Sequence, residues 1–205
     1  MVENAQRTYL VSDLNPGYLS TPFKISTKWH VITGAPCSGK TTLINQLSEA
    51  GFLTAHETAR EYFEIEMAKG RSSQEIRCSG PPTQQGIFDL QQRLEDGLRP
   101  DQVVFLDRGL PDSLTFNRLY GLNPDQFLFE CRKHCYASVF ILDRLPFARE
   151  VQLGLEDEKS AQFIDIWLER DYSILGYRVV RVPVCSPNER LGFVLDRIPD
   201  PKKSG

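Results

Sequence analysis

The sequence predicts an α/β fold in which a parallel sheet carries helices on both of its faces. Short apolar runs with strand character alternate along the chain with longer amphipathic segments, which is typical of parallel strands joined by helical crossovers. The chain has 205 residues, which is long enough for one such domain and short for two. We therefore expect one domain over residues 29–198, preceded by an extension (1–28) and followed by a tail (199–205).

Five runs are candidates for the strands of this sheet. Two of them are continuously apolar up to a final aspartate, as expected for strands that are buried on both faces. The other three contain β-branched and aromatic residues beside turn-forming ones. In chain order the candidates are residues 29–33, 51–56, 102–107, 138–143 and 177–183.

Helices are predicted between the strands from apolar spacing and from residues that favour helix starts and stops. Residues 71–82 are rich in Ser, Gly and Pro, so we expect a loop there. In the extension, the short runs 8–11 and 23–25 could pair at a sheet edge, fold back as a loop or stay disordered. The predicted helices are 42–47, from 57 onwards, 83–98, from 111 onwards, from 123 towards 134, 159–175 and 186–198.

The segment between the first strand and the first helix carries the clearest chemistry. It reads Gly34-Ala35-Pro36-Cys37-Ser38-Gly39-Lys40-Thr41-Thr42 and fits G-x-x-x-x-G-K-[ST]. Its glycines let backbone N–H groups close around phosphates, Lys40 can reach the β- and γ-phosphates, and the Thr41 hydroxyl can ligate Mg²⁺ bound to them. A turn that fits by chance is the alternative. The strand before and the helix after favour a phosphate-binding loop, with Lys40 facing solvent until phosphate binds.

Two carboxylates follow predicted strands. Because ligands bind at the carboxyl edge of an open parallel sheet, both would lie near the loop. Glu57 suits a general base or an indirect Mg²⁺ partner, and a helix-start acid is an equal alternative. Asp107 can orient hydrated Mg²⁺ or take a proton from an acceptor, and a capping acid is the weaker alternative.

Three further charged residues could contact a substrate. Arg108 follows Asp107 and could pair with phosphate or substrate, or form a salt bridge instead. Arg60, one turn after Glu57, could reach an anionic substrate, although a solvated helix arginine is the more common situation. Asp112 could contact the substrate or serve only as a first-turn acid.

Residues 144–158 are charged and interrupted by Pro146 and Gly154. They are a candidate lid over the site, with Arg144 and Arg149 as its arginines, or an ordinary surface connection.

Composition narrows the class of protein. A net charge of -3 and a pI near 5.7 give no basic field that would attract nucleic acid or anionic membrane. No run approaches the roughly 18 apolar residues of a membrane span, and no signal-peptide core is present. Five cysteines without a C-x-x-C pair indicate reduced thiols, so we expect a soluble, cytoplasmic protein. Cys131, His134 and Cys135 could be metal ligands, but a buried helix face is favoured because no second ligand cluster accompanies them.

The phosphate loop, Glu57-Thr58-Ala59-Arg60 and Asp107-Arg108-Gly109, in this order, resemble the small AAA-domain predicted ATPases. That family is similar to nicotinamide riboside kinase and to other nucleoside and nucleotide kinases. The resemblance covers about residues 28–198. It implies a three-layer P-loop NTPase fold with a five-stranded parallel sheet, ATP with Mg²⁺, and a lid arginine. The segment 152–158, near which such a lid commonly carries its arginine, contains none.

Two functions follow. The first is a kinase that transfers the ATP γ-phosphate to a small, nucleoside-like acceptor, with Lys40 and Arg108 at the phosphates and Glu57 or Asp107 as the base. The second is a nucleotide-dependent switch, or a slow ATPase or GTPase, without a small-molecule acceptor. The missing lid arginine favours the second function, and the paired carboxylates favour the first.

Overall fold

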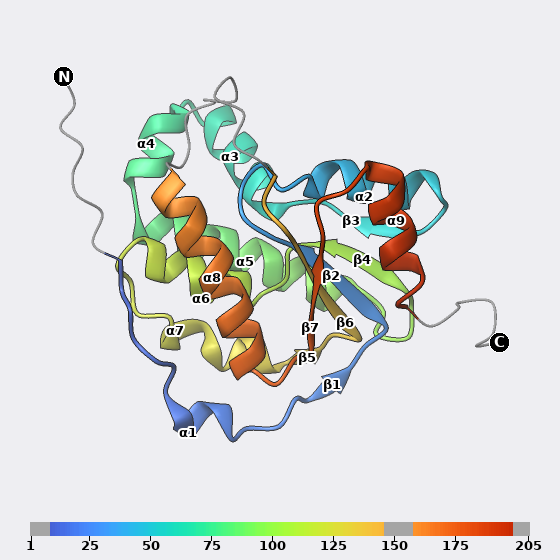
Figure 1. Cartoon of the computed structure of the whole chain (residues 1–205). Helices are drawn as coiled ribbons and strands as arrows, with labels where there is room; N and C mark the ends of the chain where they lie inside the picture. The colour runs from blue at the N-terminus through green and yellow to red at the C-terminus, as the bar shows by residue number, and fades with distance from the viewer. Residues whose placement is uncertain (1–8, 146–157, 199–205) are drawn as a thin grey trace.

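A computed structural model describes residues 9–145 and 158–198 of the chain. Its centre is a five-stranded parallel sheet in the order β3-β4-β2-β6-β7. Helices lie on both faces of the sheet (Figure 1), which confirms the predicted fold. The strands are β2 (Trp29–Thr33), β3 (Leu53–Ala55), β4 (Val104–Asp107), β6 (Ser138–Leu142) and β7 (Val179–Val182).

Each central strand feeds two cores, because successive side chains point to opposite faces of a sheet. Val31 and Leu106 belong to one core, whereas Ile32 and Phe105 belong to the other. The first core packs under α5 (Pro81–Gly97), α6 (Asp112–Leu119) and α8 (Glu158–Ile174), and the second under α2 (Lys40–Glu49) and α9 (Pro187–Leu195).

Strand β2 lies at the point where the strand order reverses. Its neighbours β4 and β6 both pair with it in parallel. The helix α2 that leads from β2 to β3 lies on one face of the sheet, whereas α6, which follows β4, and α8, which follows β6, lie on the other. The crevice outside the carboxyl end of such a strand is the usual ligand site of an open α/β sheet. The loop that follows β2 therefore occupies this crevice.

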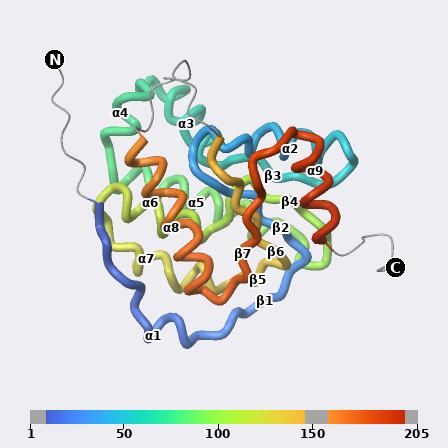
Figure 2. The backbone as a smooth tube through the Cα atoms, viewed as in Figure 1, coloured from blue at the N-terminus to red at the C-terminus, as the bar shows by residue number. Residues whose placement is uncertain are grey.

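The extension is partly ordered by a small second sheet. Its strand β1 (Ile25–Ser26) pairs in parallel with β5 (His134–Cys135), and the short helix α1 (Pro16–Leu19) precedes it. Of the three open alternatives, pairing therefore holds for residues 25–26, while residues 9–15 run as a loop along the α8 side (Figure 2). The division into extension, domain and tail stays a prediction.

Two predicted boundaries were wrong. The helix from 123 does not run towards residue 134. It ends as α7 (Asp125–Leu128), a 3₁₀ turn follows (Glu130–Arg132), and β5 is drawn into the pairing with β1. The expected loop 71–82 contains the helix α4 (Ser73–Cys78), which follows α3 (Thr58–Ala68). A capping box of Ser72 and Glu75 starts α4, a local signal that the composition of the segment obscured.

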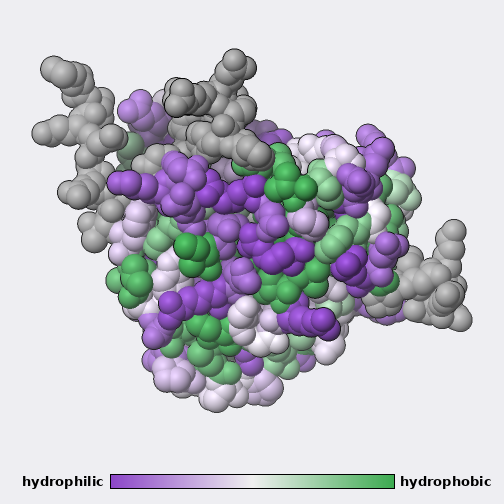
Figure 3. Space-filling model, viewed as in Figure 1, coloured by the Kyte–Doolittle hydropathy of each residue, from purple (hydrophilic) through white to green (hydrophobic). Residues whose placement is uncertain are grey.

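The described surface is mixed in polarity. On the face drawn in Figure 3, hydrophilic and hydrophobic side chains are interspersed. Exposed apolar side chains such as Met67 and Ile166 are ordinary for a protein surface. Within residues 9–145 and 158–198, no helix combines the length and the apolar character needed to cross a bilayer.

Candidate functional site

The loop between β2 and α2 has a backbone that its glycines permit. Gly34 has φ 148°, and a Cβ at this position would lie 2.9 Å from the carbonyl oxygen of Leu142. Gly39 has φ 90° immediately before α2. Both positions therefore require glycine, and the loop places the N-terminus of α2 at the crevice.

Lys40 is not where the sequence predicted. Its side chain is buried, and Nζ donates to the carbonyl oxygens of Gly34 and Ala35, at 2.9 Å each. The expectation that Lys40 faces solvent is wrong, because a buried ammonium requires acceptors and these carbonyls are within its reach. Burial lowers the pKa of Lys40 to about 8, with a further contribution from the charge of Arg108.

Asp107 ends β4 opposite Ile32 of β2. The residue is 6% exposed, and its Oδ1 is buried without a hydrogen-bond partner among the described residues. Burial raises the pKa of Asp107 to about 6, and the negative charge of Glu57 adds to the shift. A buried carboxylate oxygen with no donor is suited to a cation.

Arg108 joins two carboxylates at the same edge. Its Nε donates to Oε1 of Glu57 at 2.9 Å, and its Nη1 donates to Oδ1 of Asp112 at 3.3 Å. Arg108 has φ 75°, a conformation that non-glycine residues rarely adopt. The charge of Arg108 holds the pKa of Glu57 below its usual value, although burial opposes the shift. Burial of the guanidinium is outweighed by the carboxylates, so the pKa of Arg108 is raised.

Asp112 is enclosed by the protein. Its Oδ1 accepts from the Thr33 hydroxyl, and its Oδ2 accepts from the Tyr172 hydroxyl at 2.6 Å and from the Gly109 amide at 3.2 Å. With 3% exposure and both oxygens in use, Asp112 anchors Arg108 and the turn after β4. A direct role in substrate binding stays an untested prediction.

The remaining predicted residues lie on α2, on α3 and after β6. Thr41 and Thr42 are exposed in the first turn of α2, and Arg60 is exposed on α3. Arg144 donates to Glu158. Arg149 and the rest of the candidate lid over 146–157 lie outside the described residues.

The alternative metal site near β5 has no support in the described part of the chain. There, no group of three or more His, Cys, Asp or Glu is placed to hold a metal ion. Cys131 lies in the 3₁₀ turn, and His134 and Cys135 form β5, so the three do not share a helix. The His134 ring packs against Trp29, with 4.8 Å between the ring centroids.

Sequence reasoning missed Arg190, which contacts the phosphate loop from α9. Its Nη1 donates to the carbonyl oxygen of Ser38, and the residue is 4% exposed. The capping box Ser186–Glu189 predicts where α9 begins. It carries no signal that the Arg190 side chain reaches back to the loop.

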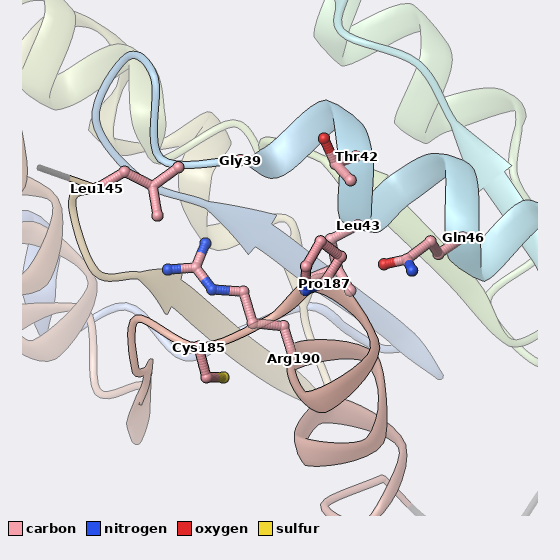
Figure 4. A pocket seen from close by; sticks show the side chains of 8 residues that line it. All are labelled: Gly39, Thr42, Leu43, Gln46, Leu145, Cys185, Pro187 and Arg190. Carbon is pink, nitrogen blue, oxygen red and sulfur yellow. The ribbon is translucent and has the colours of Figure 1, made fainter. Parts of the chain in front are cut away.

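A pocket of about 140 Å³ lies beside the loop (Figure 4). Its walls are formed by the start of α2, the segment that follows β6, and the start of α9 with the segment that leads into it. Its lining residues are Gly39, Thr42, Leu43, Gln46, Leu145, Cys185, Pro187 and Arg190.

Comparison with known proteins supplies a family and a fold. A family model described as an AAA domain matches residues 29–190. No curated protein matches the chain.

Solved kinase structures share the fold. The NadR protein in complex with NR is 20% identical with a TM-score of 0.58, over 83% of this chain and 50% of that one. Deoxyadenosine kinase from M. mycoides is 18% identical with a TM-score of 0.55, over 82% of this chain and 97% of that one. Thymidylate kinase from Ehrlichia chaffeensis is 15% identical with a TM-score of 0.54, over 84% of this chain and 98% of that one. This chain spans about half the length of the NadR chain, and the likeness is one of fold.

Proposed function

Because the chain belongs to the AAA domain family, as its motifs predicted, we propose that it is an ATP-dependent phosphotransferase acting on a small, nucleoside-like acceptor. The observation that carries the proposal is the meeting of Glu57, Asp107 and Arg108 at the mouth of the phosphate loop. Kinase chemistry needs such a base and such positive charge beside the transferred phosphoryl group. The fold shared with deoxyadenosine kinase and thymidylate kinase supports the choice of acceptor class.

The loop binds the β- and γ-phosphates in this proposal. Lys40 exchanges the carbonyl oxygens of Gly34 and Ala35 for phosphate oxygens, which are stronger acceptors because they are charged. The phosphates also favour the protonated ammonium, so the pKa near 8 rises when nucleotide binds. The pocket beside Gly39 could take the base.

Two residues beside the loop offer oxygen atoms that suit Mg²⁺ as ligands. The buried, unpartnered Oδ1 of Asp107 and the exposed hydroxyl of Thr41 are hard oxygen donors, and Mg²⁺ in kinases is held by one or two such groups together with substrate phosphates. Bound Mg²⁺ neutralises charge on the phosphates. In the proposed site, Asp107 and Thr41 hold it.

Glu57 is the proposed general base. Its side chain is 23% exposed and its lowered pKa keeps it ionised at neutral pH, whereas Asp107 is nearly enclosed. The acceptor hydroxyl gives its proton to the Glu57 carboxylate as its oxygen bonds to the γ-phosphorus. The bond from that phosphorus to the bridging oxygen breaks, and ADP leaves. Arg108 orients Glu57 and places positive charge nearby.

A nucleotide-dependent switch or slow NTPase is the second candidate. It is favoured by the pairing of Arg144, one of the two candidate lid arginines, with Glu158. An arginine that stabilises the transition state is worth roughly 10³-fold or more in rate, so its absence would leave slow hydrolysis. We also propose a cytoplasmic location, because all five cysteines are free thiols.

A screen of acceptors separates the two functions. ADP release from ATP and Mg²⁺ is measured with and without single nucleosides and nucleoside monophosphates, with Lys40→Met as the inactive control. We expect one acceptor class to accelerate release at least tenfold and to become phosphorylated. A slow rate that no acceptor changes would support the switch. A protein that binds neither ATP nor GTP would refute both functions.

A further inference from the structure

Arg190 joins three structural elements beside the phosphate loop. Its guanidinium donates from Nη1 to the carbonyl oxygen of Ser38, from Nη2 to that of Asp143 at 3.2 Å, and from Nε to that of Pro183 at 3.0 Å. These acceptors belong to the loop, the end of β6 and the end of β7. The guanidinium therefore ties α9 to the loop and to two strand ends at once (Figure 4).

The positive charge of Arg190 is buried without a carboxylate partner among the described residues. All three of its acceptors are neutral carbonyls. The carboxylate of the adjacent Asp143 is taken by Arg181, at 2.7 Å. Burying a charge without a counter-ion costs free energy. An anion bound in the adjacent loop would reduce this cost.

The guanidinium lies directly against the start of α2. A Cβ at Gly39 would be 3.1 Å from Nη1 of Arg190, so no other side chain fits there without displacing it. The N-terminus of α2, with its partial positive charge, begins at the next residue. Two sources of positive potential therefore meet behind the loop, and an anion in the loop would offset both.

We propose that Arg190 is a positioning residue for the nucleotide triphosphate. It fixes the Ser38 carbonyl, and with it the inward direction of the loop amides, and it supplies positive charge from behind the loop. This inference rests on the proposed function only in so far as the loop binds phosphates. It requires no particular acceptor.

The proposal differs from a purely structural tie in what it predicts for charged and neutral ligands. If Arg190 only holds α9 in place, its removal would weaken the binding of every ligand of the neighbouring pocket to the same extent. Loss of a positioning cation would weaken the binding of each ligand in proportion to its phosphate charge. Tripolyphosphate, a non-hydrolysable ATP analogue and adenosine separate the two cases, because adenosine has the base and ribose without phosphate.

The test compares Arg190→Met, Arg190→Lys and the control Arg197→Met, an exposed arginine just after α9 whose contacts are with Phe193. Inhibition constants against a fluorescent ATP analogue are measured for the three ligands. We expect Arg190→Met to lose at least tenfold for tripolyphosphate and the ATP analogue and less than twofold for adenosine. Arg190→Lys keeps the charge but fewer ties, so we expect an intermediate loss. The control should bind as wild type does.

Equal losses for tripolyphosphate and adenosine, or unchanged affinity for tripolyphosphate in Arg190→Met, would overturn the inference. If Arg190→Met fails to fold, the same ratio of losses is read on Arg190→Lys, where a ratio of one overturns it. Wild-type protein that binds neither tripolyphosphate nor the ATP analogue would instead refute the proposed function.

Discussion

Burial shifts the pKa values of two residues in the site. Lys40 has its pKa lowered to about 8 and Asp107 has its pKa raised to about 6, in both cases first because they are buried. Each shift moves the residue towards its neutral form, which costs stability when the residue is charged at neutral pH. A bound nucleotide with Mg²⁺ would favour the charged form of both residues. The site therefore contains two buried charged groups, Lys40 and Asp107, to which a bound ligand would supply a counter-charge.

Lys40→Met should reduce the affinity for ATP by about tenfold or more. The ammonium is the cation nearest to the proposed β- and γ-phosphates, and a hydrogen bond to a charged group contributes about 1.5 to 3 kcal/mol. Calorimetry with a non-hydrolysable ATP analogue measures the loss. The wild-type affinity should itself fall as the pH rises through 8, as Lys40 is deprotonated. If the variant binds the ATP analogue with wild-type affinity, Lys40 does not contact the phosphates.

Asp107→Asn should abolish turnover and yet raise stability. The folded pKa of Asp107 lies above its unfolded value of 3.8, so the ionised group destabilises the fold at pH above about 6, and the penalty is relieved as the pH falls towards 3.8. A shift of this size corresponds to on the order of 3 kcal/mol. Thermal unfolding should show a higher Tm for the variant at pH 8, with a smaller difference at pH 5. A lower Tm at pH 8 would contradict the account.

At the scale of elements, α5 holds the two ends of the site together. Gln91 on α5 receives the hydroxyl hydrogen bond of Thr58 at 2.8 Å and donates to the carbonyl oxygen of Arg108 at 3.2 Å. Thr58 starts the helix that Glu57 precedes, so one side chain links the backbones beside Glu57 and Arg108. The contact between α3 and α5 therefore controls how the base faces the arginine.

Gly86→Ala should disturb this contact. A Cβ at Gly86 on α5 would lie 2.1 Å from Cε2 of Tyr62 on α3, so the Tyr62 ring, or the helix that carries it, must move. We expect a destabilisation of about 1 to 3 kcal/mol and a loss of turnover larger than any loss of ATP affinity, because Glu57 moves while the loop does not. Denaturant unfolding and acceptor-stimulated ADP release measure the two effects.

Gly97→Ala is the matched control for this substitution. Gly97 is also on α5, but nothing lies within 4 Å of the position where its Cβ would be. Alanine favours the helix by roughly 0.5 to 1 kcal/mol over glycine, so this variant should be neutral or more stable. Equal behaviour of the two variants would show that the close approach of Tyr62 is not what matters.

At the scale of the whole molecule, residues 9–28 pack against α6, α8 and β5. Arg118, which forms a buried ion pair with Asp171, donates to the carbonyl oxygen of Ser12. Tyr9 stacks on Phe163 of α8, with 4.5 Å between the ring centroids. These contacts join the extension to α6 and α8 in one core, although the extension itself lies outside the family match over residues 29–190.

Leu14→Ala should therefore destabilise the protein without changing nucleotide affinity. Leu14 is 3% exposed within the core, and such truncations cost about 2 to 5 kcal/mol. Val11→Ala, in the same segment but at a side chain that is 69% exposed, is the control and should change little. Denaturant unfolding and ATP-analogue binding are measured on both. Loss of affinity in Leu14→Ala at a temperature where it stays folded would mean that the extension belongs to the site.

The sequence by itself determined the alternation of strands and helices, the phosphate loop and the two carboxylates that follow strands. These features are local: apolar runs select buried strands, Gly34 and Gly39 allow one loop conformation, and a strand end places its last residue at the edge of the sheet. The order of the strands was not local, nor was the pairing of β1 with β5. That pairing depends on residues more than a hundred positions apart.

Only the tertiary structure decided which charges meet. Arg108 contacts Glu57 across 51 positions, and Arg190 contacts Ser38 across 152 positions, so no spacing in the sequence reports either contact. The orientation of the Lys40 side chain towards Gly34 was likewise decided by the tertiary structure, because it follows from the burial of Lys40. Burial and long-range pairing depend on how the sheet stacks its helices, and the free energy of a charge is set by those neighbours. Sequence pattern can therefore name the candidate residues of such a site, while their charge states and partners follow from the packing around them.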